Sequence, residues 1–144
     1  MKADKGKVVV AGGTLDSKFM TYNQSGVYVF EDEAWELKNK SNMDLWSDKD
    51  IWDFVSVAIN PRDKNEIAIG CYSPTPLSIV KNGVVTEIYT SENSDIQVNT
   101  SNQSTLISDL KYDNDGNLWL ANNFSDHPLK VLKADKTWQT ISLT

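Results

Sequence analysis

A two-hairpin unit that recurs at a nearly fixed spacing is the feature that most restricts what this chain can fold into. Residues 76–81 align with residues 128–133 at an offset of 52 (128 − 76), and both segments begin Pro-Leu and end in Lys. Ile69 corresponds to Leu120 at almost the same offset, 51 residues (120 − 69). Self-similarity at this period indicates a repeat architecture, in which each unit buries its apolar faces against its neighbours.

The clearest hairpin of the repeat lies in residues 107–122. Apolar and polar residues alternate over 107–112, and 118–121 is a short apolar run that contains a β-favouring tryptophan. The segment 113–117 between them, Asp-Asn-Asp-Gly-Asn, is rich in residues that tolerate left-handed backbone angles, and Gly116 adopts positive φ at no steric cost. The sequence therefore predicts a tight turn at 113–117 with a strand on each side of it.

Strand signals occupy most of the remaining chain and fall into three units. We expect about eleven strands and no helix. They lie at 7–11, 26–30 and 34–37 in the first unit, at 54–59, 66–70, 77–80 and 84–89 in the second, and at 107–112, 118–121, 129–132 and 137–142 in the third. The first unit matches strands two to four of the plan, and no room for a first strand is expected before Lys7.

Four antiparallel strands in a repeat of roughly 40–50 residues form the blade of a β-propeller. We therefore predict an all-β fold, a partial β-propeller of about three antiparallel four-stranded blades at 7–40, 52–91 and 106–143, in a single domain over residues 1–144. A β-sandwich of short strands is the alternative, although it does not require matched two-hairpin repeats. Propellers close with about four to eight blades, so we expect either a piece of a longer polypeptide or self-association of bare faces and edges.

The five tryptophans fall into two groups. Trp35, Trp119 and Trp138 lie within predicted strands, where large aromatic side chains usually fill the space between sheets, and we predict that they are core residues. Trp46 and Trp52 lie in the charged, irregular connector before the second unit. We expect this connector to pack back onto the sheet through its aromatic residues, with a contact of Trp46 and Trp52 to a sugar or a protein as the alternative.

Composition limits the classes of partner. The chain has 14 basic and 20 acidic residues and a net charge of −6, which argues against nucleic acid because neutralising phosphates needs clustered Lys and Arg. No run of about 18 apolar residues is present to span a bilayer, and the first residues lack the apolar core of a signal peptide. The single cysteine, Cys71, excludes an internal disulfide.

Residues for catalysis or metal binding are scarce. His127 is the only histidine, and neither it nor Cys71 has a spacing that pairs a nucleophile with a base or builds a zinc site. We therefore predict no enzymatic activity and no cofactor or metal. Asp113, Asp115 and Asn117 have the alternate spacing of calcium ligands, but the later positions of the calcium-loop pattern are not met. The tight turn explains the same three residues without a metal ion.

Residues 107–122 resemble the blade motif of the two-component regulator propeller repeats, in which an apolar strand is followed by Asp-x-x-Gly-Asn-Leu-Trp, an apolar residue and a small-residue end. The second unit keeps this plan in residues 60–70 but lacks the Gly-Asn-Leu-Trp core. Pro-Arg-Asp at 61–63 in one blade, with Asp-Gly-Asn-Leu-Trp at 115–119 and Pro-Leu-Lys-Val-Leu-Lys at 128–133 in the next, is similar to the propeller of PorZ-like proteins of the type IX secretion machinery.

The resemblance implies a non-catalytic propeller segment that acts as a protein-interaction scaffold in bacterial type IX secretion. It also implies a periplasmic or cell-surface location, and a protein partner or the remaining blades of the parent chain to cover the bare edges. The broader propeller family supplies the periplasmic sensors of hybrid two-component regulators. A glycan-sensing propeller segment of such a regulator is therefore the alternative function.

Overall fold

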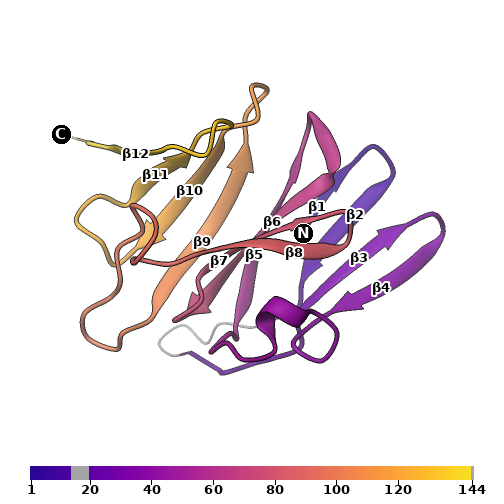
Figure 1. Ribbon diagram of the computed structural model, residues 1–144, viewed down its shortest axis with the longest axis horizontal. Coiled ribbons are helices and arrows are strands. Elements are labelled where there is room, and N and C mark those ends of the chain that lie inside the picture. The colour runs from indigo at the N-terminus through magenta and orange to yellow at the C-terminus, as the bar shows by residue number, and fades with distance from the viewer. Residues whose placement is uncertain (14–19, 144) are drawn as a thin grey trace.

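The computed structural model describes residues 1–13 and 20–143, and this part of the chain is all-β apart from one turn of 3-10 helix. Three antiparallel four-stranded meanders fan out side by side as a curved arc (Figure 1). The predicted fold is confirmed: the chain is a partial β-propeller built from antiparallel blades. Residues 14–19, in the blade predicted at 7–40, lie outside the described residues.

Each blade is a run of four consecutive strands. Blade 1 contains β1 (Lys2–Asp4), β2 (Lys7–Ala11), β3 (Val27–Glu31) and β4 (Ala34–Lys38). Blade 2 contains β5 (Phe54–Asn60), β6 (Asp63–Ser73), β7 (Leu77–Lys81) and β8 (Val84–Tyr89). Blade 3 contains β9 (Thr105–Tyr112), β10 (Leu118–Asn123), β11 (Leu129–Leu132) and β12 (Trp138–Ile141). The 3-10 turn η1 (Asp44–Trp46) lies in the connector between blades 1 and 2.

Blade 1 contains a strand that the sequence analysis did not expect. β1 pairs antiparallel with β2, with Lys2 opposite Val9. Two residues suffice for the hairpin between them, because Lys5 and Gly6 both adopt positive φ, at 47° and 82°. The expectation of no first strand was wrong because β1 is short, polar and mostly exposed, so it lacks the apolar alternation on which strand prediction depends.

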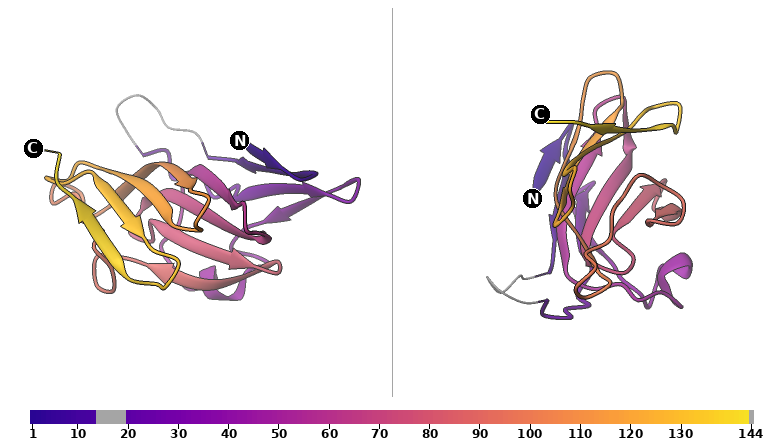
Figure 2. Two further views of the ribbon diagram at one scale, coloured as in Figure 1. Left: turned by 90° about the horizontal axis from the view of Figure 1, so that it is seen from above. Right: turned by 90° about the vertical axis from the view of Figure 1, so that its left-hand side faces the viewer.

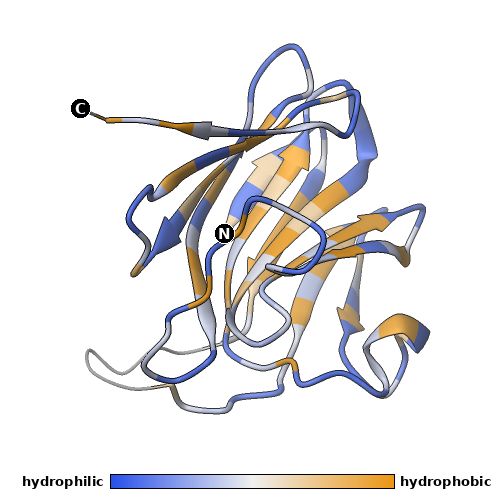
Figure 3. Ribbon diagram, turned by 60° about the vertical axis from the view of Figure 1, so that its left-hand side comes forward, coloured by the Kyte–Doolittle hydropathy of each residue, from blue (hydrophilic) through white to orange (hydrophobic). Residues whose placement is uncertain are grey.

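Two apolar cores lie between the blades, one on each side of blade 2. The left view of Figure 2 shows blade 2 between blade 1 (indigo to purple) and blade 3 (orange to yellow), and Figure 3 shows that apolar residues concentrate on the strands. Alternate residues of β6 divide between the two cores: Ile67 and Ile69 pack in the first, and Ala68 packs in the second. The connector adds Trp46 and Ile51 to the first core, so it packs back on the blades as expected.

Blades 2 and 3 are also joined through their backbones. Tyr72 pairs with Leu106 and Ser73 with Thr105, which makes one continuous sheet of eight strands. Gly70 allows this close approach, because a Cβ atom at this position would lie 2.9 Å from the Ile107 carbonyl oxygen of β9. None of the helical structure in residues 1–13 and 20–143 has the length and hydropathy that a bilayer crossing requires.

Candidate functional site

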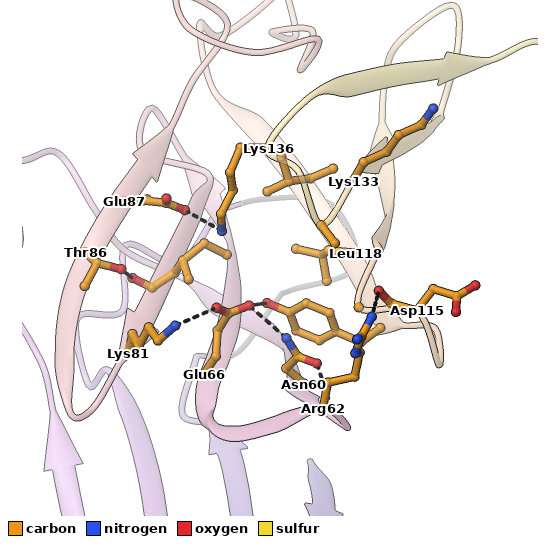
Figure 4. Close-up of a pocket in the computed structure, with 15 residues that line it drawn as sticks. Asn60, Arg62, Glu66, Lys81, Thr86, Glu87, Asp115, Leu118, Lys133 and Lys136 are labelled. Atoms are coloured by element: carbon orange, nitrogen blue, oxygen red, sulfur yellow. Dashed lines mark hydrogen bonds and ion pairs between the residues drawn. The ribbon is translucent and has the colours of Figure 1, made fainter.

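A charged cleft of about 400 Å³ opens between blades 2 and 3. Its apolar floor includes Ile79, Leu118 and Leu132, and polar side chains from both blades surround it (Figure 4). The charged residues at its rim are Arg62, Glu66, Lys81, Glu87, Asp115, Lys133 and Lys136. The cleft therefore combines an apolar base with a dense ring of opposite charges.

Glu66 contacts three other residues that line the cleft. Its Oε1 atom accepts hydrogen bonds from the Tyr112 hydroxyl at 3.0 Å and from Asn60 Nδ2 at 3.1 Å, and its Oε2 atom lies 4.0 Å from Lys81 Nζ. Burial, and after it the negative charge of Glu66, raises the pKa of Tyr112 well above its usual value. Tyr112 is therefore a hydrogen-bond donor in the cleft and has no tendency to ionise at neutral pH.

Glu87 is a second carboxylate that lines the cleft, and it contacts residues of both blades. Its Oε2 atom accepts a hydrogen bond from the Tyr89 hydroxyl at 3.1 Å and lies 3.2 Å from Lys136 Nζ, so it links blade 2 to blade 3. Burial, followed by the charge of Glu87, raises the pKa of Tyr89 to about 12. The Arg62 guanidinium crosses the same cleft and donates to the Asp115 carbonyl oxygen at 3.0 Å. These contacts hold two neighbouring blades in register.

A second cleft, of about 340 Å³, lies between blades 1 and 2 and uses the same kind of contact. Lys7 is buried and donates to the Lys64 carbonyl oxygen at 2.7 Å, and Lys38 donates to the Gly83 carbonyl oxygen at 3.2 Å. Hydrogen bonding to Lys64, together with the nearby Lys7, lowers the pKa of Glu31 despite some desolvation. Both clefts therefore join one blade to the next, and their charged groups are largely engaged with each other.

The predicted turn at 113–117 is present, and both carboxylate oxygens of Asp113, the first of the three candidate calcium ligands, accept hydrogen bonds there. Asp113 Oδ1 accepts the backbone N–H groups of Asp115 and Asn117, each at 2.9 Å. Its Oδ2 atom accepts Asn117 Nδ2 and Trp119 Nε1, also at 2.9 Å. These bonds, that of Trp119 foremost, lower the pKa of Asp113 to about 2. Within the described residues, no group of three or more His, Cys, Asp and Glu side chains is arranged to hold a metal ion.

The two connector tryptophans have different environments. Trp46 is fully buried between blades 1 and 2, where its indole N–H donates to Ser78 Oγ at 2.9 Å and its ring lies 5.3 Å from that of Phe54. Trp46 therefore presents no surface to a sugar or a protein, and its burial agrees with the expectation that the connector packs back onto the sheet through its aromatic residues. Trp52 is partly exposed, and its ring centroid lies 5.1 Å from that of the exposed Tyr22.

The prediction that the strand tryptophans are core residues was wrong for two of the three. Trp35 is 59% exposed and Trp119 is 38% exposed, because each projects from the outward face of a terminal blade. Trp138 packs against the second core, with its ring 5.3 Å from that of Tyr89. A position in a strand predicted that all three side chains pack between sheets. Whether a side chain lies on the buried or the exposed face depends on the register of its strand, which the local sequence does not give.

The outward face of blade 1 is a continuous apolar surface. The register places Val8 opposite Phe30 and Phe30 opposite Trp35, and in the adjacent row it places Val10 opposite Tyr28 and Tyr28 opposite Leu37. We call these six residues the open face: Val8, Val10, Tyr28, Phe30, Trp35 and Leu37. None of them is charged, and all are partly or largely exposed.

The signal for the open face was present in the sequence. Val9, Val27 and Val29 on the other side of the same strands are buried in the first core, so β2 and β3 are apolar on both faces. Strands that are apolar on both faces are typical of sheets covered on both sides. Only one side of blade 1 is covered by blade 2.

The outward face of blade 3 is more polar. Trp119, Ala121 and Leu129 line a shallow cavity of about 150 Å³ together with the charged residues Asp109 and Lys111. The two ends of the arc are therefore unlike, and the open face of blade 1 is the more apolar of the two.

Cys71 and His127, the two residues considered for catalysis, have different environments. Cys71 is fully buried, and burial, followed by the negative charge of Asp53, raises the pKa of its thiol. His127 is exposed in the turn between β10 and β11. The prediction of a non-catalytic protein stays a prediction, since no observation tests activity directly.

Comparisons with known proteins give one structural relative of interest. No family model matches the chain, and no curated protein matches it. The solved structure of PorZ, described as an essential bacterial surface component of the type-IX secretion system of Porphyromonas gingivalis, is similar with a TM-score of 0.85 at 17% sequence identity. The match covers 97% of this chain and 19% of the PorZ chain, so the chain spans about a fifth of the length of this relative. At this identity the similarity shows a shared fold.

Proposed function

We infer that this chain is a non-catalytic β-propeller segment that acts as a protein-interaction scaffold in bacterial type IX secretion, in the manner of PorZ-like proteins. The observation that carries this proposal is the open face of blade 1. Contiguous apolar surface of this kind is uncommon on monomeric soluble proteins and marks a site that another element covers. The structural similarity to PorZ supports the biological setting.

The occupant of the open face is another blade of the parent chain or a protein partner. The packing of blades 1, 2 and 3 shows how a blade face is covered, namely by the face of the next blade. Closed propellers need about four to eight blades, which favours a segment of a longer propeller protein. The similarity to PorZ, described as a surface component, supports a proposed location in the periplasm or on the cell surface. A glycan-sensing segment of a two-component regulator stays the alternative prediction.

The solution mass of the isolated chain tests the open face. We expect the mass measured by light scattering to rise with concentration, because uncovered apolar faces associate. Trp35→Glu should shift the chain towards the monomer, and Ser101→Glu, an exposed control in the loop before β9, should not. A native chain that stays monomeric and soluble at all concentrations would contradict the proposal that this face requires an occupant.

Site-specific photo-crosslinking in the source bacterium tests the biological setting. A photoreactive amino acid at Trp35 of the full-length protein should crosslink to a type IX secretion component or to another blade of the same polypeptide. The same group at Ser101 serves as the matched control. Equal yields of the same crosslinks from both positions would count against the scaffold function.

A further inference from the structure

Two exposed aromatic residues adopt backbone conformations that are unfavourable for them. Tyr22 has a φ of 56° and is 59% exposed, and Phe124 has a φ of 60° and is 62% exposed. Bulky residues rarely adopt positive φ, and doing so costs conformational free energy. Burial of these two rings offsets little of that cost, because most of each ring remains in solvent. Strained residues of this kind concentrate at functional sites.

A buried carboxylate holds Tyr22 in this conformation. Asp53 is fully buried, and its side chain accepts the backbone N–H groups of Thr21 at 2.8 Å, Tyr22 at 3.1 Å and Asn23 at 2.9 Å. The N–H group of Asp53 in turn donates to the Asn23 carbonyl oxygen at 2.8 Å. The position of Tyr22 is therefore determined by several hydrogen bonds.

Each exposed ring packs on a second aromatic ring, and the two pairs are linked. The ring centroids are 5.1 Å apart for Tyr22 and Trp52 and 6.1 Å apart for Tyr72 and Phe124. Asp53 follows Trp52 directly, and its carbonyl oxygen accepts the Tyr72 N–H at 2.9 Å. We call these four aromatic residues the aromatic row. It extends from the β2–β3 connection across β6 of blade 2 to the β10–β11 connection, and so involves all three blades.

Exposed acidic residues lie close in the sequence to two members of the aromatic row. Asp50 lies two positions before Trp52, Asp126 lies two positions after Phe124, and both are exposed. The exposed faces of aromatic rings attract Lys and Arg side chains, and neighbouring carboxylates strengthen this preference. Because the end rings project into solvent, they fit a macromolecular segment better than a small molecule, which needs a concave site.

We propose that the aromatic row is a docking surface for a segment of another protein that presents Arg or Lys side chains. Rigid aromatic side chains supply a large contact area at low entropic cost, and they are the commonest hot spots of interfaces. The proposal rests on the proposed scaffold function but uses a surface distinct from the open face.

A titration of the isotopically labelled chain with synthetic peptides tests the proposal. The probe is a nonapeptide with three Pro-Arg-Leu repeats, and the signal is the indole N–H resonance of Trp52, whose Nε1 atom is buried and has no hydrogen-bond partner among the described residues. We expect a saturable shift. The double variant with Tyr22→Gly and Phe124→Gly should weaken binding about ten-fold or more, as expected for the loss of two interface hot spots.

Glycine is chosen for these variants because it adopts positive φ without strain, so the rings are removed while the backbone is kept. Gln103→Gly is the matched control, because Gln103 is also exposed and has a φ of 58°. This variant should bind the peptide like the native chain. A preserved melting temperature in the double variant shows that any loss of binding is local.

Three outcomes would overturn the proposal. They are equal binding of a Pro-Glu-Leu nonapeptide, unchanged affinity in the double variant, and a shift produced by cellohexaose but not by the cationic peptide, which would make the row a carbohydrate site. The Trp35→Glu variant should bind the peptide normally. If the peptide fails to bind while Trp35→Glu still alters self-association, only this inference fails and the scaffold proposal stands.

Discussion

Replacing Asp53 with asparagine removes hydrogen bonds that fix the connection between β2 and β3 against the connector. The carboxylate is fully buried and accepts four hydrogen bonds, two at each oxygen. Oδ1 accepts the Thr21 hydroxyl at 2.6 Å and the Asn23 N–H at 2.9 Å, and Oδ2 accepts the N–H groups of Thr21 and Tyr22. An asparagine side chain has one oxygen, so it retains two of these bonds whichever way its amide is oriented.

The expected loss of unfolding free energy has two sources. Two hydrogen bonds are lost, and the two that remain are made to a neutral amide oxygen in place of a charged carboxylate. A hydrogen bond to a charged group contributes about 1.5–3 kcal/mol, and leaving a buried donor without a partner costs about 1–3 kcal/mol. Water reaches the partly exposed donors of residues 21–23, which reduces the total. We expect Asp53→Asn to lower the free energy of unfolding by about 2–4 kcal/mol, or roughly 7–13 °C in melting temperature for a chain of this length.

Urea denaturation followed by tryptophan fluorescence, together with thermal melting by circular dichroism, measures this loss. Asp50→Asn is the control, because Asp50 is an exposed aspartate in the same connector and should change stability by less than about 0.5 kcal/mol. A similarly small effect of Asp53→Asn would refute the reasoning. It would mean that water replaces the carboxylate at no cost and that Asp53 does not hold residues 21–23.

Three further predictions concern the turn and the tryptophans. Gly116→Val should cost about 1–3 kcal/mol in chemical denaturation, because Gly116 has a φ of 82° and a Cβ atom there would lie 3.3 Å from Arg62 Cδ; unchanged stability would exclude the strain. Trp46→Ala should cost about 3–5 kcal/mol and Trp119→Ala about 1–2 kcal/mol, since only Trp46 is fully buried; equal losses would contradict the structure. The pKa of Asp113 is about 2 in the folded chain against 3.8 ordinarily, so its stabilisation is present above about pH 4 and is lost as the pH falls towards 2. After allowance for screening by solvent this contribution is on the order of 1 kcal/mol. The unfolding free energy of the native chain should therefore fall between about pH 4 and pH 2, and that of Asp113→Asn should fall less over the same range.

Local sequence signals predicted most strands and the decisive turn, because each depends on residues that are close together in the chain. The hairpin at 113–117 is an example: Gly116 supplies the positive φ, and every hydrogen bond that the Asp113 side chain accepts comes from residues 115–119. The repeat of two hairpins then predicted the blades. β1 was missed because its three residues carry no apolar pattern of their own and are ordered by pairing with β2.

Burial could not be predicted where it depends on distant partners. Lys130 is 1% exposed because its ammonium group donates to Gln97 Oε1 at 3.1 Å and Thr140 Oγ1 at 3.3 Å, and burial lowers its pKa. No local pattern distinguishes this lysine from an exposed one. Likewise Trp35 was expected in the core but faces solvent from a terminal blade, because the face from which it projects depends on the pairing of β4 with β3.

The candidate surfaces required the same long-range information. The local sequence indicated Trp52 but not its neighbour Tyr22, since their contact depends on hydrogen bonds that the N–H groups of residues 21–23 donate to the buried Asp53. The open face was indicated only indirectly, by strands that are apolar on both sides. Its extent followed once the registers of β2, β3 and β4 were known.

The backbone ladder between β6 and β9 also sets the order in which the chain opens. Blades 2 and 3 share hydrogen bonds across their boundary, so neither can detach without breaking the ladder, and we expect them to unfold as one cooperative unit. Blade 1 meets blade 2 mainly through side chains and through isolated backbone bonds such as Gly13 N–H to the Phe54 carbonyl oxygen. Amide protons of blade 1 should therefore exchange with solvent ahead of those in the other two. We therefore expect blades 2 and 3 to open together and blade 1 to detach from them at lower energetic cost.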